Sequence, residues 1–150
     1  MATADRTPIR IAGYHPETTV HSRAVRLIEG SLTAHAADLC TPQVTASIVD
    51  LGHRTSEIVG LVASGTFDIA YISSIPFQRY VPELAAFDIP FLLPSRARAM
   101  QVLDHGLRPR LDVAADAGMP VRVLAIWDNG ARQITSNVRP ILSPDDCRGL

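Results

Sequence analysis

A chain of 150 residues, 47% of them hydrophobic, is long enough to form one domain with a buried core. The 14 basic residues, all arginine, balance 15 acidic ones, which excludes the strongly basic face typical of nucleic-acid-binding proteins. No apolar run is long enough to cross a bilayer, and the first residues lack the apolar stretch of a signal peptide.

The first third of the chain predicts a strand, a helix and a second strand. Residues 9–12 form a short alternating strand that stops at Gly13. Thr18 and Thr19 are good N-cap residues for a helix of about 15 to 18 residues. Its expected apolar stripe consists of Ala24, Leu27, Ile28 and Leu32. Residues 43–49 alternate again and predict the second strand.

The middle of the chain predicts a short helix and a buried strand. Ile58, Leu61 and Val62 form an apolar helical stripe, and Gly65 stands where a glycine often ends a helix. Residues 67–72 are almost continuously apolar, as expected of a buried parallel strand.

The second half begins with a loop-rich segment that holds four prolines, residues 73–94. Ser95 is expected to cap a long helix, which Pro109 should kink or interrupt. Its apolar side consists of Leu103, Leu107, Leu111 and Ala114.

The pattern then predicts a fourth strand over residues 121–127, a possible fifth over 133–138, and a short helix that starts at Ser143. We expect residues 1–8 to be a disordered tail, residues 9–128 an α/β lobe with a largely parallel sheet, and residues 129–150 a crossover segment.

Polar side chains follow the predicted strands, where open parallel sheets bind their ligands. The candidates are Tyr14 after the first strand, Arg54 after the second, Ser73 and Ser74 after the third, and Arg132 after the fourth. Helix N-termini and an arginine suit an anionic ligand such as a carboxylate. The same residues would also serve simply to cap helices and turn corners.

Four segments in order resemble the solute-binding proteins of tripartite ATP-independent periplasmic (TRAP) transporters. They are Ser64-Gly65-Thr66-Phe67-Asp68-Ile69-Ala70 after Leu51-Gly52, Phe87-Asp88-Ile89-Pro90-Phe91-Leu92 after Pro82-Glu83-Leu84, Asn129-Gly130-Ala131-Arg132-Gln133 before Thr135-Ser136, and Arg139-Pro140-Ile141 before Ser143-Pro144-Asp145. The resemblance runs from about Ile9 to Leu150, and it is the order of the segments that makes it specific.

The resemblance implies a periplasmic-binding-protein-like fold, in which two lobes close over a small organic acid and deliver it to a membrane permease. No bond is made or broken, so neither enzyme activity nor a cofactor is expected, and the location would be the periplasm. Arg132, Ser73, Ser74, Tyr14 and Arg54 then stand near ligand-facing positions. A ligand-sensing module of the same fold is the alternative.

Two departures from the family pattern shape these expectations. Some relatives that bind sugar acids carry an acidic residue and an arginine around the position where this chain has Ser73 to Pro76, which argues against that ligand class. The family's carboxylate-clamping arginine comes a few residues after Leu150. The 150 residues are therefore expected to be a truncated product or a non-functional gene fragment, with weak affinity at most.

Other functions find little support in the residues. The five histidines, His15, His21, His35, His53 and His105, form no HExxH motif, and no G-x-S-x-G, G-x-G-x-x-G or P-loop lysine occurs. Cys40 and Cys147 fall in distant predicted elements and are expected to be small buried residues rather than a disulfide. Trp127 and Phe91 are expected in the core.

Overall fold

The structure is a computed structural model that describes residues 6–130 and 134–150. The strands are β1 (Thr7–Ala12), β2 (Cys40–Thr45) and β3 (Ile69–Ala70), and the α-helices are α1 (Val20–His35), α2 (Ile58–Ala63), α3 (Arg96–Val102) and α4 (Arg108–Asp116). A π-helical turn, Leu103–Leu107, joins α3 to α4, and 3₁₀ turns cover residues 48–51, 55–57, 75–77, 82–88 and 144–147. None of the described helices is long and apolar enough to cross a membrane.

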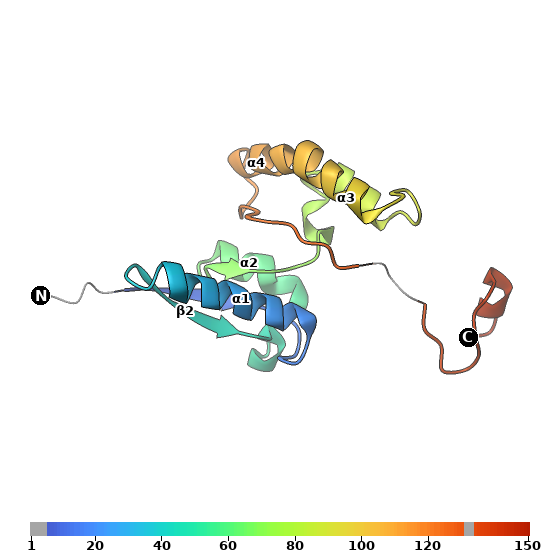
Figure 1. Ribbon diagram of the computed structural model, residues 1–150, viewed down its shortest axis with the longest axis horizontal. Helices are drawn as coiled ribbons and strands as arrows, with labels where there is room; N and C mark the ends of the chain where they lie inside the picture. The colour runs from blue at the N-terminus through green and yellow to red at the C-terminus, as the bar shows by residue number, and fades with distance from the viewer. Residues whose placement is uncertain (1–5, 131–133) are drawn as a thin grey trace, which may run out of the picture.

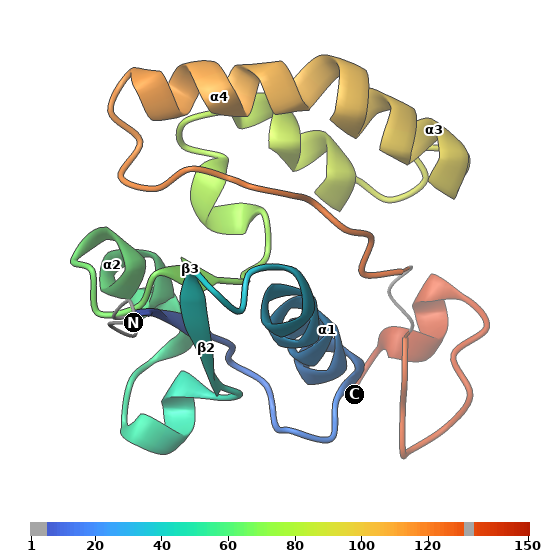
Figure 2. The same ribbon diagram turned by 60° about the vertical axis from the view of Figure 1, so that its left-hand side comes forward.

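The sheet has three parallel strands in the order β2-β1-β3. Its register places Thr7 opposite Cys40 and Ile11 opposite Ile69. The chain crosses from β1 to β2 through α1 and from β2 to β3 through α2, and the two helices cover opposite faces (Figures 1 and 2). The expected α/β fold with a parallel sheet flanked by helices is confirmed, and all three strands end at the same edge.

Strand boundaries differ from the sequence prediction at several ends. β1 begins at Thr7, whose N–H donates to the Leu39 carbonyl at 3.1 Å, so residues 7 and 8 are not part of a tail. β2 ends at Thr45 because Ser47 forms an isolated bridge with Tyr14. β3 pairs only over Ile69–Ala70, although the Tyr71 N–H still donates to the Ala12 carbonyl at 3.2 Å.

Helix α1 begins as the sequence predicts, because the Thr19 hydroxyl accepts a hydrogen bond from the Ser22 N–H at 3.2 Å. Its apolar face is partly different from the expected stripe. Val25 is the buried aliphatic residue, whereas 75% of Leu27 is exposed. Helix α2 also ends as expected, since Gly65 adopts a φ of +75° just after its last turn.

Two separate apolar clusters support the fold. One lies between the sheet and α2 and contains the buried residues Ala12, Ile48, Ile58 and Phe67. The other packs the 82–88 turn against the α3–α4 helix and contains Val81, Leu84, Leu103, Leu107 and Leu111. Burial of each large aliphatic side chain contributes about 1.5–3 kcal/mol. The α3–α4 helix therefore has its own core and forms a layer apart from the sheet (Figure 1).

The predicted interruption of the long helix is confirmed, and it takes the form of a π-helical turn between α3 and α4. Pro109 has no N–H, so a regular α-helix would leave the His105 carbonyl without its partner. The π-helical turn Leu103–Leu107 comes just before it and places Pro109 in the first turn of α4, where no donor is needed.

The predicted fourth and fifth strands are wrong over the described residues. Residues 121–130 and 134–138 are irregular, and residue 133 lies outside the described part of the chain. Val123 and Ile126 pack against the α3–α4 cluster, and the Arg108 side chain donates to the Leu124 carbonyl at 3.1 Å. This segment runs along the helical layer and makes no pairing with the sheet. The predicted start near Ser143 is confirmed, because its N–H donates to the Asp146 carboxylate at 2.8 Å.

Candidate ligand-binding site

The site is organised by a close approach of backbone at Gly13, directly after β1. The Gly13 N–H donates to Thr45 at 2.8 Å, and its carbonyl accepts from Ile48 at 2.9 Å. A Cβ atom at this position would lie 2.3 Å from the Ala46 carbonyl oxygen and 2.9 Å from Cε1 of Tyr71. Glycine therefore lets the ends of β1 and β2 meet beneath the Tyr71 ring.

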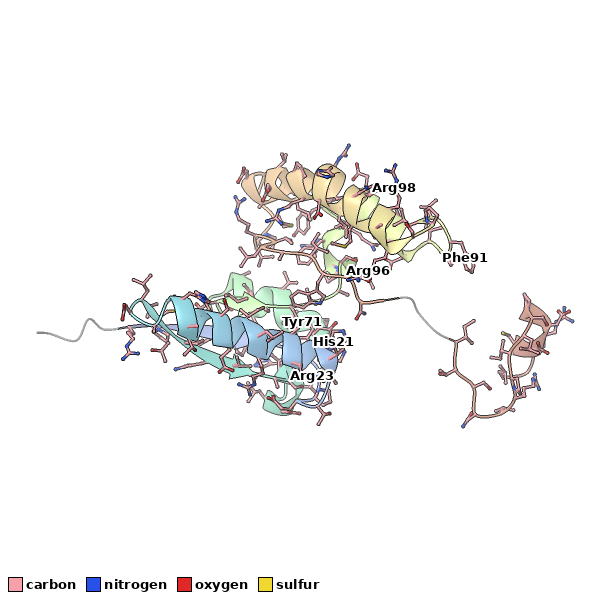
Figure 3. All side chains as sticks on the ribbon, viewed as in Figure 1. His21, Arg23, Tyr71, Phe91, Arg96 and Arg98 are labelled. Carbon is pink, nitrogen blue, oxygen red and sulfur yellow. The ribbon has the colours of Figure 1, made fainter. Side chains whose placement is uncertain are left out.

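Five rings gather beyond the ends of β1 and β3, and we call them the aromatic wall: Tyr14, His15, His21, Tyr71 and Trp127. The His15 and His21 rings stack with centroids 4.4 Å apart, and the Tyr14 and Tyr71 centroids lie 4.9 Å apart. Trp127 reaches the wall from the irregular segment, 5.9 Å from Tyr71. Figure 3 shows His21 and Tyr71 close together on the side of the lobe that faces α3.

Two short hydrogen bonds fix the rings of the wall. His15 Nδ1 lies 2.6 Å from the Tyr71 hydroxyl, and His21 Nε2 lies 2.6 Å from Oδ1 of Asn129. Burial raises the pKa of Tyr71 to about 12, so the phenol keeps its proton. Burial, and then the neighbouring His21, lower the pKa of His15. Either His15 Nδ1 or the Tyr71 hydroxyl can donate in their hydrogen bond, because the donor is set by the tautomer of His15.

An ion pair stands beside the wall on the side of α3. Arg96 Nε lies 2.8 Å from Asp128 Oδ2, and the other Asp128 oxygen accepts from the Gly130 N–H at 2.9 Å. The Arg96 side chain remains 77% exposed, so its guanidinium is accessible to a second anion. Because Asp128 lies between Trp127 and Asn129, this cation is held next to the aromatic wall (Figure 3).

The structure brings together some of the residues predicted from the sequence. Tyr14 belongs to the wall, where burial raises its pKa against the opposing effect of the Ser73 backbone N–H. The Ser73 side chain is exposed, and that of its neighbour Ser74 is half-buried. Arg54 is exposed at the turn after β2, and its backbone N–H donates to Glu57 at 2.9 Å. Arg132 lies outside the described residues. The ligand-binding roles of all five residues remain predictions.

Sequence reasoning missed most of the wall. The expectation that Trp127 and Phe91 lie in the core is wrong, since they are 41% and 100% exposed. The available signal was the position of His15 and Tyr71 at the ends of two strands and of His21 in the first turn of a helix. Cys40 is buried as expected, but Cys147 is exposed, and both are free thiols.

The wall is an open surface rather than an enclosed pocket. A small cavity of about 10 Å³ lies elsewhere, under the α3–α4 helix, and is lined by Leu103, Leu111 and Val123 among others. Its size is that of a single water molecule, so it is no ligand site. Within residues 6–130 and 134–150, no three histidine, cysteine, aspartate or glutamate side chains are grouped to hold a metal ion.

Known proteins resemble this chain in sequence. Residues 50–150 match the family described as "Bacterial extracellular solute-binding protein, family 7". The chain is 34% identical over 100 residues to the 2,3-diketo-L-gulonate-binding periplasmic protein YiaO of Escherichia coli (strain K12), a match that covers 67% of this chain and 30% of the relative. It is 35% identical over 94 residues to a solute-binding protein of Verminephrobacter eiseniae (strain EF01-2), covering 63% of this chain and 28% of that one.

A solved structure has the same fold. A TRAP periplasmic solute-binding protein from Sulfitobacter sp. NAS-14.1, with bound β-D-galacturonate, superposes with a TM-score of 0.59 at 19% identity. The superposition covers 72% of this chain and 37% of that chain, so this chain matches well under half the length of these relatives. Members of the matched family are solute-binding proteins and not enzymes. The chain belongs to family 7 of the bacterial extracellular solute-binding proteins.

Proposed function

We propose that this protein captures a small hydroxylated organic acid, of the sugar-acid kind, for a TRAP-type secondary transporter. The observation that carries the proposal is the meeting of an accessible Arg96 guanidinium with the aromatic wall at the carboxyl edge of a parallel sheet. The cation suits a carboxylate, and the faces of the rings suit the C–H side of a sugar.

The choice of ligand class reverses the expectation drawn from Ser73 and Pro76. Relatives are named for diketogulonate binding and hold galacturonate, and both ligands combine one carboxylate with several hydroxyls. In this chain Asp128 pairs with Arg96, Asn129 bonds to His21 of the wall, and Tyr71 bonds to His15, so donors and acceptors are mixed there. Hydroxyl groups need both kinds of partner. Family membership supports delivery to a membrane permease and a periplasmic location as parts of the same proposal.

The open wall sets the expected affinity. Small-molecule sites normally bury about 70–90% of the ligand surface. A wall open on one side buries much less of the ligand. We therefore expect the 150-residue chain to bind with a Kd of about 1 mM, a binding free energy near −4 kcal/mol.

The test is a titration of the ¹⁵N-labelled chain with galacturonate, followed by NMR. The chain has a single tryptophan, so one indole N–H resonance reports on Trp127. We expect that resonance and the amide of Tyr71 to shift with saturation, and Arg96→Gln to weaken binding. Methyl galactoside, which has the ring without the carboxylate, should bind less. Absence of saturable shifts at millimolar galacturonate would refute the proposal.

A further inference from the structure

Asp128 lies at the centre of a short stretch that joins the sheet to the helical layer. Its neighbour Trp127 contacts Tyr71, beyond the end of β3, with 5.9 Å between the ring centroids. Asp128 itself pairs with Arg96, the first residue of α3, at 2.8 Å. On its other side, Asn129 contacts the first turn of α1. A negative group of the protein therefore stands in the place where we expect the carboxylate of the ligand.

The two members of this ion pair are held very differently. The Asp128 side chain is 33% exposed, and its second oxygen accepts a hydrogen bond from the Gly130 N–H at 2.9 Å. Gly130 closes this turn with a φ of +76°, which glycine adopts without strain. The Arg96 side chain is 77% exposed and reaches Asp128 from the other layer. The carboxylate is thus the fixed member, and the guanidinium is the member that can turn toward another anion.

An exposed ion pair of this kind is weak enough for a ligand to replace. Such pairs contribute little, because water screens both charges. The carboxylate of a ligand offers Arg96 the same chemical partner, and the aromatic wall adds further contacts. While Asp128 holds the guanidinium, that carboxylate must either displace Asp128 or bind beside a like charge. Both cases weaken the binding of an acid, and neither affects a neutral sugar.

We propose that Asp128 is a built-in competitor of the ligand, whose carboxylate occupies Arg96 in the unliganded chain and competes with the incoming acid for the guanidinium. The proposal rests on the function proposed above, in which Arg96 receives the carboxylate of a sugar acid. It gives Asp128 a role opposite to that of a binding residue, because removal of its charge should tighten the complex. An aspartate that only orients Arg96 would have the reverse effect.

Asp128→Asn tests the competition with little change of shape. Asparagine keeps an oxygen that can accept from the Gly130 N–H, but it carries no charge. The ¹⁵N-labelled chain and the variant are titrated with galacturonate at constant ionic strength, and the Trp127 indole resonance is followed. We expect the variant to bind galacturonate about 1.5- to 5-fold more tightly, the range that corresponds to one exposed ion pair. Methyl galactoside, which lacks the carboxylate, should bind both chains alike.

Asp116→Asn is the matched control. Asp116 pairs with Arg122 at the end of α4 and is 72% exposed. This variant therefore removes the same charge and an exposed arginine–aspartate pair, but away from the aromatic wall. It should leave the affinity for galacturonate unchanged, which separates competition at Arg96 from an effect of the net charge of the chain.

The outcomes separate the two proposals. Weaker or unchanged binding of galacturonate by Asp128→Asn would overturn the competition while leaving acid capture intact. Tighter binding of methyl galactoside by the same variant would overturn it as well, since that result indicates a rearranged wall rather than a released cation. An equal gain in Asp116→Asn would also count against it. If galacturonate binds neither the unmodified chain nor Asp128→Asn, the proposed function itself fails, and this inference fails with it.

Discussion

The close approach at Gly13 makes a strong prediction for Gly13→Ala. The added methyl carbon would lie 2.3 Å from the Ala46 carbonyl oxygen, which is backbone and has no easy direction of retreat. Atoms in favourable contact stay about 3.5 Å apart, so one of the two segments must move by roughly 1 Å. That movement also disturbs the two backbone hydrogen bonds of Gly13, to Thr45 and from Ile48.

The magnitude follows from these two losses. Overpacking costs about 1–3 kcal/mol, and weakening two buried backbone hydrogen bonds adds about 1 kcal/mol. We therefore expect Gly13→Ala to lower the free energy of unfolding by about 2–4 kcal/mol. For a chain of this size that corresponds to a fall in Tm of about 5–15 °C. Cε1 of Tyr71, 2.9 Å from the added carbon, should shift as well and disturb the aromatic wall.

Urea denaturation followed by circular dichroism measures the stability, and the fluorescence of the single tryptophan reports the wall. Gly30→Ala is the matched control. An added methyl at Gly30, within α1, meets nothing within 4 Å, so this variant should be more stable by about 0.5–1 kcal/mol. A Gly13→Ala chain as stable as the unmodified protein would show that the segments do not approach as described.

Three further predictions concern ionisable side chains. Burial lowers the pKa of His15, so the stabilising contribution of the neutral imidazole is present above about pH 6.5 and is lost as pH falls through the lowered pKa. The change in Tm between about pH 7.5 and pH 5 should therefore be smaller in His15→Gln than in the unmodified chain. Asp68 accepts three hydrogen bonds from Arg10, which lower the pKa of its carboxyl group, so its contribution to stability is present above about pH 4 and is lost in acid. Asp68→Asn should therefore reduce the fall of Tm in acid, and an unchanged fall would contradict the pairing. A maleimide should label exposed Cys147 in the native chain and buried Cys40 only after denaturant is added, as mass spectrometry would reveal; equal labelling would contradict the burial.

Local signals predicted the first half of the fold well. The Thr19 cap, Gly65 and the apolar residues of β1 and β3 each act over a few residues, and the structure uses all of them. Strand lengths were less predictable, because a strand ends where its partner ends. β3 pairs over only two residues because β1 stops at Ala12, although the apolar pattern continues to Ile72.

The wall could not be assembled from the sequence, because its members meet only through long-range packing. Residues 121–127 alternate like a strand, yet Val123 and Ile126 find their apolar partners on the α3–α4 helix. This packing places Trp127 beside Tyr71 and Asn129 beside His21, although each pair is more than fifty residues apart in the chain. Of the predicted residues, Tyr14 could be assigned to the site from the sequence, because it lies just beyond the end of the central strand β1.

The π-helical turn before α4 keeps three leucines in line. Leu103, Leu107 and Leu111 are four residues apart, and in a regular α-helix each such step rotates the side chain by about 40° around the axis. The wider turn over residues 103–107 absorbs part of this rotation, so all three reach the same buried cluster. Removal of one residue there, such as Gly106, would restore a regular α-helix in which Leu103 and Leu111, then seven residues apart, differ by only about 20° around the axis. The π-helical turn therefore accommodates one additional residue while Leu111 stays in the buried cluster.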